Sequence, residues 1–329
     1  MRSPSYEPAH CIVCGHAESE VVAELDAIRR QVEALWAFHE KRLKLGTPIN
    51  RLRDRVTFSE HPPFRLVACT ECGLVYRNPT ERAFEIESTY ARDCPPRETL
   101  QTLHDVQRDA YRPQARRVSG LLHRGATVLE VGSYVGAFLS SARDSGLNAI
   151  GVDINPAVNT FARSLGFDVH DGQIGDVPVR PFDGIAIWNT FDQLEDPRAV
   201  VVAARARLKS GGLLAIRVPN GAFYKRWSRR LRGRGNVVAR SLLAHNTLLT
   251  FPYRWGFTRQ SLSALLRQSG LETVDVVGDV LVPTADSWTR RWARAEERMV
   301  KRILKTVSHS NGDAAPWFEV YATSTQPGA

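Results

Sequence analysis

Two pairs of cysteines have the spacing of a metal site. Cys11 and Cys14 form one C-x-x-C pair, Cys69 and Cys72 form the other, and a glycine follows each second cysteine. Four thiolates suit the tetrahedral coordination of Zn²⁺, and glycine eases the tight turn that each pair requires. We therefore predict a structural zinc site, since four cysteine ligands leave no open position for catalysis. Four buried or redox-active cysteines are the alternative.

A glycine-containing turn is the second place where the sequence could do chemistry. Glu130, Gly132 and Gly136 stand between a β-rich run and a helical stretch. A turn without side chains lets a ligand approach the backbone, and the next helix offers free N–H groups. Asp153 ends the following β-rich run, where a carboxylate can accept hydrogen bonds from both hydroxyls of a ribose. The pattern predicts a nucleoside pocket, and a tight turn without a ligand is the alternative.

The centre of this turn argues against a dinucleotide. Counted from Gly132, a G-x-G-x-x-G fingerprint needs glycine at positions 134 and 137, where the chain has Tyr134 and Ala137. The bulky Tyr134 side chain would block a pyrophosphate from reaching the backbone. A nucleoside without phosphates does not need glycine at that position.

Short β-rich runs alternate with helical stretches from residue 126 onward. This alternation predicts an α/β domain with a mainly parallel sheet. Ligands of such sheets bind at the carboxyl ends of the strands, which is where the glycine turn and Asp153 fall. The expected strands are 127–131, 148–152, 168–170, 184–188, 213–218 and 318–322, and the expected helices are 137–145, 157–165 and 198–208.

The first 80 residues are predicted to form a zinc-binding domain with an inserted helix over residues 18–44. Apolar residues of this segment step by four and three along one helical face. The stripe predicts packing on the same domain, and a homodimer contact is the alternative. Residues 81–118 are expected to form a connector of mixed helix and loop, broken at Pro95 and Pro96. The stripe consists of Val21, Leu25, Ile28, Val32 and Leu35.

As an ordered set, the motifs resemble class I methyltransferases that use S-adenosylmethionine (SAM). The resemblance implies a Rossmann-like sheet with helices on both faces over residues 119–329. It also implies SAM as the cofactor, which carries no phosphates. The similar segments are E-x-G-x-x-x-G from Glu130, F-D-G-I-A-I-W from Phe182, L-E-D-P from Leu194, L-K-S-G-G-L-L-A-I-R-V-P-N from Leu208 and F-T-R-Q-S-L from Phe257.

The same resemblance implies a role for each cofactor-binding residue. The glycine turn would line the methionine part of SAM, and Glu130 would fix that turn. Asp153 would bind the ribose, and Ile154 would pack on the adenine. Asp171 would meet the adenine amino group, with a simple turn residue as the alternative, and Asn189 would lie near the methionine end. The implied residues are Glu130, Gly132, Ser133, Tyr134, Gly136, Asp153, Ile154, Asp171 and Asn189.

The layout of cysteine pairs, then G-L-V-Y-R-N-P from Gly73, then a SAM domain is similar to bacterial sugar C-methyltransferases with an N-terminal zinc-binding domain. The resemblance implies a small anionic acceptor, such as a nucleotide-linked sugar or a secondary metabolite, and RNA is the alternative. Many relatives have Glu-His where this chain has Asp192-Gln193, and glutamine cannot act as a general base. The candidates for a base are His245, Tyr253 and Asp192, and a structural role for His245 is the alternative.

The net charge of +9 is concentrated in one stretch. Between Arg205 and Arg254 there are twelve Lys and Arg residues and no Asp or Glu. Such a stretch indicates an anionic partner. Residues 222–250 are therefore predicted to cap the carboxyl edge of the sheet over the acceptor, with Tyr224 and Trp227 able to stack on a sugar or base. A solvated cap, an RNA surface and a membrane surface are the alternatives.

The remaining features predict an ordinary globular protein. Hydrophobic residues make up 43% of the chain, and no run of about 18 apolar residues predicts a membrane span. The first residues have no apolar signal region, so we expect a cytoplasmic protein. Residues 286–307 are predicted to form an amphipathic helix that packs through Trp288, Trp292, Met299 and Ile303, rather than a membrane anchor. Cys94 is expected to be a buried or half-exposed residue without a role.

Overall fold

The computed structural model describes residues 6–47, 63–82, 87, 90–92, 94–178, 180–231, 237–245, 253–280, 289–310 and 314–324. Two compact units divide the chain. Unit 1 contains residues 1–82, 218–264 and 277–318, and unit 2 contains residues 83–217, 265–276 and 319–329. The described residues of the basic stretch 222–250 thus belong to the unit that holds the cysteine pairs. The domain boundaries expected at residues 80 and 118 stay a prediction.

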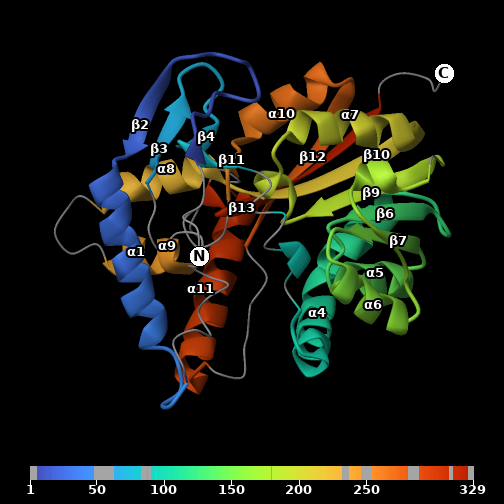
Figure 1. Ribbon diagram of the computed structural model, residues 1–329, viewed down its shortest axis with the longest axis horizontal. Coiled ribbons are helices and arrows are strands. Elements are labelled where there is room, and N and C mark those ends of the chain that lie inside the picture. Colours follow the sequence, from blue (N-terminus) through green and yellow to red (C-terminus); the bar gives the residue numbers. More distant parts are fainter. Residues whose placement is uncertain are drawn as a thin grey trace. The chain divides into compact units, whose positions relative to one another are not determined.

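Unit 2 is built on a seven-stranded sheet with the order β12-β13-β10-β9-β6-β7-β8 (Figure 1). The first five of these strands along the chain run parallel to one another. Their order in space reverses between β6 and β9, which is the switch point of a doubly wound sheet. The strands are β6 (Thr127–Val131), β7 (Asn148–Asp153), β8 (Asp168–Asp171), β9 (Phe182–Trp188), β10 (Leu208–Pro219), β12 (Leu271–Asp279) and β13 (Trp317–Ser324).

Helices cover both faces of this sheet. Figure 1 shows α4 (Arg97–Leu121), α5 (Ala137–Asp144) and α6 (Pro156–Ser164) on one face and α7 (Pro197–Arg207) on the other. All seven residues of β9 are buried, as expected for a parallel strand covered on both sides. The predicted Rossmann-like α/β fold is confirmed. Two short 3₁₀ turns, η3 (Ile174–Asp176) and η4 (Phe191–Gln193), also belong to unit 2, and helix α10 (Arg259–Gln268) has residues in both units.

The described part of the segment 81–118 contains helical residues 90–92, a loop at 94–96 and then the long helix α4. It runs for 25 residues from Arg97, with Pro96 as its N-cap and Pro113 inside it. The loop at Pro95-Pro96 separates this helix from the helical residues 90–92, and proline is tolerated just before the first turn of a helix. Pro113 removes one backbone donor, yet the helix continues because its buried side, with Tyr111, Ala115 and Val118, packs on the rest of unit 2.

Unit 1 contains a four-stranded sheet with the order β11-β4-β3-β2, in which each neighbouring pair is antiparallel. Three strands come from the first 80 residues, and β11 comes from residues near 255, so the sheet joins distant parts of the chain. Several helices of the described residues belong to the same unit. The strands are β2 (Ser19–Ala23), β3 (Arg65–Cys69), β4 (Val75–Asn78) and β11 (Trp255–Gly256), the short pair is β1 (Tyr6–Glu7) with β5 (Thr80–Glu81), and the helices are α1 (Leu25–Glu40), α8 (Gly221–Arg230), α9 (Val237–His245) and α11 (Arg291–Ser310).

The helix predicted for residues 18–44 is partly wrong. Ser19–Ala23 form strand β2, because Ser19 and Val21 pair with Cys69 and Val67 of β3. The helix begins only at Leu25. Its residues Ile28, Val32 and Leu35 are buried in one core with side chains of the sheet and of α8 and α9. These three residues of the stripe therefore pack on their own unit as predicted, whereas Val21 is exposed on β2.

The prediction for residues 286–307 is wrong about which side of the helix packs. The buried side of α11 consists of Ala293, Glu297, Lys301 and Leu304. Trp292, Met299 and Ile303 are exposed instead, and Trp288 lies outside the described residues. Two amphipathic stripes exist on this helix, and the Glu297–Lys301 ion pair allows the more polar one to be buried.

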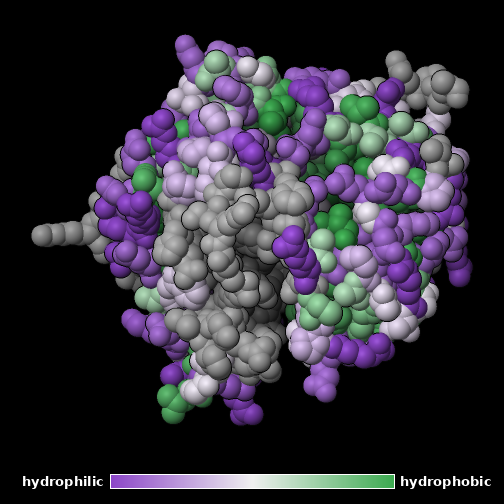
Figure 2. Space-filling model, in the orientation of Figure 1, coloured by the Kyte–Doolittle hydropathy of each residue, from purple (hydrophilic) through white to green (hydrophobic). Residues whose placement is uncertain are grey.

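In the described part of the chain, no helix is long and apolar enough to cross a membrane. Figure 2 shows mostly hydrophilic side chains on the face drawn, with smaller hydrophobic areas between them. Single exposed apolar residues such as Val202 and Val274 are normal on protein surfaces. Only exposed apolar residues that share one element call for an explanation.

Candidate functional site

The glycine turn after β6 adopts a backbone that most residues avoid. Gly132, Tyr134 and Gly136 have φ angles of 76°, 42° and 69°. Such a conformation is strained for Tyr134, and strain of this kind concentrates at functional sites. The backbone N–H groups of Gly132 and Ser133 donate to the carbonyl of Val152 at 2.8 and 3.2 Å, so the turn folds back on β7. The turn is held in one shape by the fold itself.

Gly132 also permits a close approach between two loops. A Cβ atom at this position would collide with the side chain of Thr190, which follows β9. Gly132 therefore satisfies two requirements, a positive φ and contact with the β9 loop. Both loops lie at the carboxyl ends of their strands on either side of the switch point.

Asp153, the last residue of β7, binds the turn from the neighbouring strand. Its Oδ2 accepts a hydrogen bond from Tyr134 N at 3.0 Å, and its Oδ1 accepts one from Asn155 N at 2.9 Å. Burial raises the pKa of Asp153, and the backbone donors of Asn155, Tyr134 and Ile154 oppose this effect. Each carboxylate oxygen can accept a further hydrogen bond, so Asp153 can hold the turn and a ligand hydroxyl together.

Glu130 brings a buried carboxyl group to the end of β6. Its side chain is 3% exposed, and among the described residues its Oε2 has no hydrogen-bond partner. Burial raises its pKa well above the ordinary value, the charge of Asp153 adds to this, and Arg217 opposes it. The hydroxyl of Ser133 is likewise buried without a partner within the described parts of the chain. Buried polar atoms without partners indicate a place where a polar ligand completes the site.

Asn189 lies in a polar cluster at the tip of β9. It has a positive φ of 55°. Its Oδ1 accepts a hydrogen bond from Arg217 Nε at 2.9 Å, and its Nδ2 donates to Tyr111 Oη at 3.2 Å. The Arg217 guanidinium lies 5.2 Å from the centroid of the Tyr111 ring. Sequence reasoning missed Tyr111 and Arg217, although an arginine inside the apolar strand L-L-A-I-R-V could have drawn attention.

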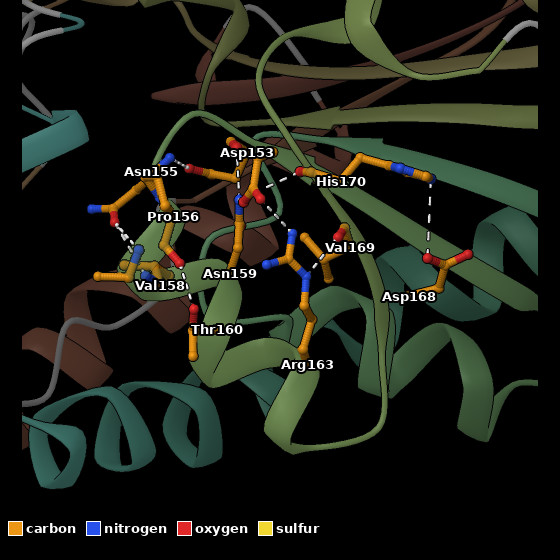
Figure 3. A network of polar contacts seen from close by, with 12 residues as sticks. Asp153, Asn155, Pro156, Val158, Asn159, Thr160, Arg163, Asp168, Val169 and His170 are labelled. Carbon is orange, nitrogen blue, oxygen red and sulfur yellow. Dashed lines mark hydrogen bonds and ion pairs between the residues drawn. The ribbon is translucent and has the colours of Figure 1, made fainter.

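Asp171 is tied to helix α6 rather than left free at the end of β8. Its Oδ1 accepts from Asn159 Nδ2 at 2.7 Å, and its Oδ2 lies 2.9 Å from Arg163 Nη2. Burial acts to raise the pKa of Asp171, but the bonds from Asn159 and Arg163 outweigh it and lower the pKa. Asn159 also donates to the carbonyl of Asp153 at 2.8 Å, and Figure 3 shows it between the ends of β7 and β8.

The structure thus brings the expected cofactor residues of unit 2 to the carboxyl ends of β6, β7, β8 and β9. Ile154 is half-buried beside Asp153. Asn155 caps α6 by accepting from Ala157 N and Val158 N, which fixes the chain just after Asp153. No sequence motif predicted that Asn159, Arg217 or Tyr111 lies at this site.

The four paired cysteines of unit 1 come together. Their Sγ atoms all lie within 4.8 Å of one another. The shorter separations are 3.4 Å for Cys11–Cys72, 3.6 Å for Cys11–Cys14 and 3.5 Å for Cys14–Cys69. Zn–S bonds of about 2.3 Å put tetrahedral sulfur atoms about 3.8 Å apart. The donor set and its spacing therefore fit a tetrahedral zinc ion.

The two cysteine turns have the same backbone geometry. Gly15 N donates to Cys11 O at 3.0 Å, and Gly73 N donates to Cys69 O at the same distance. Both glycines have positive φ, 70° and 74°. Each turn therefore needs the glycine that follows its second cysteine. Cys94 is exposed and lies outside this cluster.

A sequence model of a methyltransferase domain matches residues 103–276, which is more than half of the chain. The chain belongs to this methyltransferase family. It is thus a SAM-dependent enzyme of class I, and the matched stretch contains the turn, Asp153, Asn189 and the cluster around Arg217. No protein among the curated sequences matches the chain.

Solved methyltransferases are similar to this one in structure. A Haloferax volcanii methyltransferase in complex with a methyltransferase activator has 17% identity and a TM-score of 0.48, over 73% of this chain and 98% of that one. A SAM-dependent methyltransferase from Thermotoga maritima has 18% identity and a TM-score of 0.46, over 74% and 100%. One from Archaeoglobus fulgidus has 16% identity and a TM-score of 0.45, over 68% and 98%.

The methyltransferase places its three candidate bases in different settings. Asp192 belongs to unit 2, is fully buried and lies in η4. Tyr253 belongs to the core of unit 1, where its ring centroid is 5.7 Å from that of Trp317. The side chain of His245, the last residue of α9, lies outside the described residues. Tyr253 therefore has a structural role in the packing of unit 1.

Several side chains of the basic stretch of the methyltransferase are engaged in contacts within unit 1. Lys225 of α8 forms an ion pair with Glu20, and Arg229 lies 3.7 Å from the same carboxylate. Tyr224 is buried in the core, and its hydroxyl donates to Gln31 at 2.8 Å. The expectation that Tyr224 stacks on a ligand is therefore wrong, because its ring fills the space between α8 and α1. Trp227 stays half-buried.

Proposed function

We propose that this methyltransferase moves the methyl group of SAM to a small anionic acceptor by in-line displacement, with a nucleotide-linked sugar or a secondary metabolite as the acceptor class. The observation that carries the cofactor site is the set of buried polar atoms around the glycine turn. Glu130 Oε2 and Ser133 Oγ lack partners within the described residues, and Asp153 has acceptor capacity left. A nucleoside with a cationic amino acid part supplies the matching donors.

The residues present fit SAM, and each has a role in this proposal. The carboxylate of Asp153 accepts hydrogen bonds from the ribose hydroxyls, and Ile154 packs on the adenine. Glu130 places a negative charge near the ammonium group of the methionine part, lined by Gly132, Ser133, Tyr134 and Gly136. Asn189 stands at the methionine end. Asp171, with its pKa held low, is a carboxylate acceptor for the adenine amino group.

The chemistry of the step makes few demands on the protein. SAM supplies a methyl group already activated by a sulfonium. The enzyme therefore has to align the acceptor with the methyl group and to exclude water. The rigid turn serves alignment, because it is fixed to β7 by Asp153 and by the carbonyl of Val152. An acceptor that loses a proton needs a base, for which Asp192 and His245 remain our candidates.

An anionic acceptor is proposed from the remaining charge on α8. This helix begins at Gly221, two residues after β10 ends. Arg226 and Arg230 are exposed on it, and no acid occurs anywhere in its sequence. Arginine binds phosphate through two parallel hydrogen bonds, which suits a phosphate-bearing sugar.

The test is transfer of labelled methyl from SAM into a lysate of the source organism, followed by separation of the products by size and by ribonuclease sensitivity. We expect the label in small anionic molecules, and the mass of the product identifies the acceptor. Label in a ribonuclease-sensitive polymer would overturn the small-molecule proposal in favour of RNA. An Asp153→Ala variant in the same lysate reports whether the transfer depends on the proposed cofactor site.

We also propose that the four paired cysteines hold a structural Zn²⁺. With four sulfur ligands the ion has no position for a substrate, so it stabilises unit 1 without taking part in methyl transfer. The ion would join the segment before β2 to the turn between β3 and β4 at one end of the sheet, since Ser19 of β2 pairs with Cys69, the last residue of β3.

Replacing Glu130 with glutamine is expected to have opposite effects on stability and on binding. Because burial raises the pKa of Glu130 in the folded state, its contribution to stability is fully present below its unfolded value near 4.5 and is lost as the pH rises through the folded-state pKa. Glutamine does not ionise, so the variant does not lose this stability as the pH rises. Ligand-free Glu130→Gln should therefore melt a few degrees higher than the parent at pH 8 and bind SAM roughly 10- to 100-fold more weakly.

Thermal denaturation between pH 5 and 8, with and without SAM, measures both effects. The difference in melting temperature between variant and parent should grow with pH. Glu195→Gln is the matched control, because Glu195 is exposed on the loop after η4. A Glu130→Gln protein with unchanged affinity for SAM would contradict the role given to this carboxyl group.

A further inference from the structure

Helix α11 exposes an apolar stripe that the methyltransferase fold does not use. Trp292, Met299 and Ile303 are 51%, 58% and 56% exposed. They are spaced by seven and four residues, so they share one face of the helix. The packed face, with Ala293, Glu297, Lys301 and Leu304, is a different one. This stripe is thus a surface feature and not part of the core.

A basic stripe runs directly beside the apolar one. Arg291, Arg298 and Arg302 each precede one of the exposed apolar residues, and Lys305 continues the row. All four are exposed. Neighbouring residues of a helix point about 100° apart, so the two stripes lie side by side along its length.

The acidic residues of α11 do not neutralise this surface. The helix contains two, and both are engaged in ion pairs. Glu296 lies 2.7 Å from Arg42 of the segment after α1, and Glu297 pairs with Lys301 on the packed face. Within the described residues, the exposed face of α11 therefore combines apolar side chains with positive charge that its own two acids do not neutralise.

The segment after α1 extends the same surface at the start of α11. Arg290 N donates to Arg42 O at 2.8 Å, and Leu43 forms a β-bridge with Thr289. Leu45 follows this attachment by two residues and is 97% exposed. Lys44 is exposed beside it. Apolar and basic side chains thus come from two separate segments of unit 1.

We propose that this face of α11, with Lys44 and Leu45, binds the surface of an anionic lipid bilayer. A helix lying in a bilayer interface buries tryptophan and aliphatic side chains at the level of the headgroups, while arginines beside them reach the phosphates. The charge argues against a second copy of the chain, since two such faces would repel each other. A nucleic acid would use the arginines but would leave the Met299 and Ile303 side chains without a partner.

The test is co-sedimentation of the full-length protein with vesicles of phosphatidylcholine alone and with vesicles that also contain phosphatidylglycerol. We expect binding to the anionic vesicles only. Each basic residue near an anionic surface contributes about 1 kcal/mol, so Arg298→Gln with Arg302→Gln should weaken binding by roughly 30-fold. The triple variant Trp292→Ser, Met299→Ser, Ile303→Ser should weaken it by at least about 10-fold.

Two controls make the outcome decisive. Val202→Ser with Val274→Ser removes exposed apolar side chains from α7 and β12, and this variant should bind vesicles like the parent. Circular dichroism and SAM binding establish that each variant is folded. The proposal is overturned if the parent fails to bind anionic vesicles at low salt, or if the triple variant binds them as well as the parent. If the parent binds RNA or a second copy of itself instead of vesicles, and the triple variant loses that binding, the face has a different partner and the proposal is overturned.

Discussion

Replacing Asp153 with alanine is expected to lower the affinity for SAM by on the order of 100-fold or more. The carboxylate has two tasks in the proposed site. It accepts hydrogen bonds from the backbone of Tyr134 and Asn155, and it is placed to accept the ribose hydroxyls. Alanine removes both, so the turn loses its attachment to β7 at the same time as the ligand loses its partner.

Calorimetric titration with SAM measures this change. Asp168→Ala is the matched control. Asp168 is also an aspartate of the sheet, but it is largely exposed and is the first residue of β8. We expect its affinity to equal that of the parent. An Asp153→Ala protein that binds SAM as tightly as the parent would refute the cofactor site proposed here.

Replacing Cys69 with serine is expected to remove the metal and to destabilise unit 1. Binding of structural zinc is coupled to folding, with apparent free energies of about 10–16 kcal/mol in small zinc domains. Cys69 also ends β3, which pairs with both β2 and β4, so the loss spreads through the sheet. We expect zinc content to fall from about one ion per chain to near zero, and the melting temperature to fall by at least about 10 °C.

Elemental analysis of protein purified without chelator, together with thermal denaturation, measures both effects. Cys94→Ser is the control, since Cys94 is exposed and outside the cluster. It should change neither quantity. If the parent itself contains no zinc, the metal site is refuted, even though the four sulfur atoms lie close together.

The local patterns predicted the chemistry-bearing turns well. A C-x-x-C-G segment is a turn by virtue of its own few residues, which is why both cysteine turns have the same glycine-to-cysteine hydrogen bond. The strand–turn–helix unit around Gly132 is also local. Its parallel strands followed from the alternation of apolar runs with helical stretches.

Residues that reach the site from distant segments could not be predicted in this way. Tyr111 on α4 and Arg217 on β10 meet at Asn189, although no motif connects them. Asn159 joins the ends of β7 and β8 through hydrogen bonds that depend on how α6 packs. Their roles follow from proximity in three dimensions, which the spacing along the chain does not encode.

Tertiary structure also decided questions on which the sequence was ambiguous. Ser19–Ala23 continue a helical pattern, yet they form a strand because β3 offers its edge. Helix α11 carries two possible packing stripes, and the one with the Glu297–Lys301 ion pair is buried. Tyr224, expected to contact a ligand, fills the core instead.

By itself, the sequence determined the α/β fold, the methyltransferase family, the cysteine pairs and the turn with its acidic partner. These features depend on the repeat of helix and strand and on the chemistry of a few adjacent residues. Only the tertiary structure decided that β11 joins the N-terminal sheet, that Arg217 meets Asn189, and that Trp292 faces outward. Such outcomes depend on which distant surfaces fit one another, and burial of the best-fitting surfaces outweighs local preference.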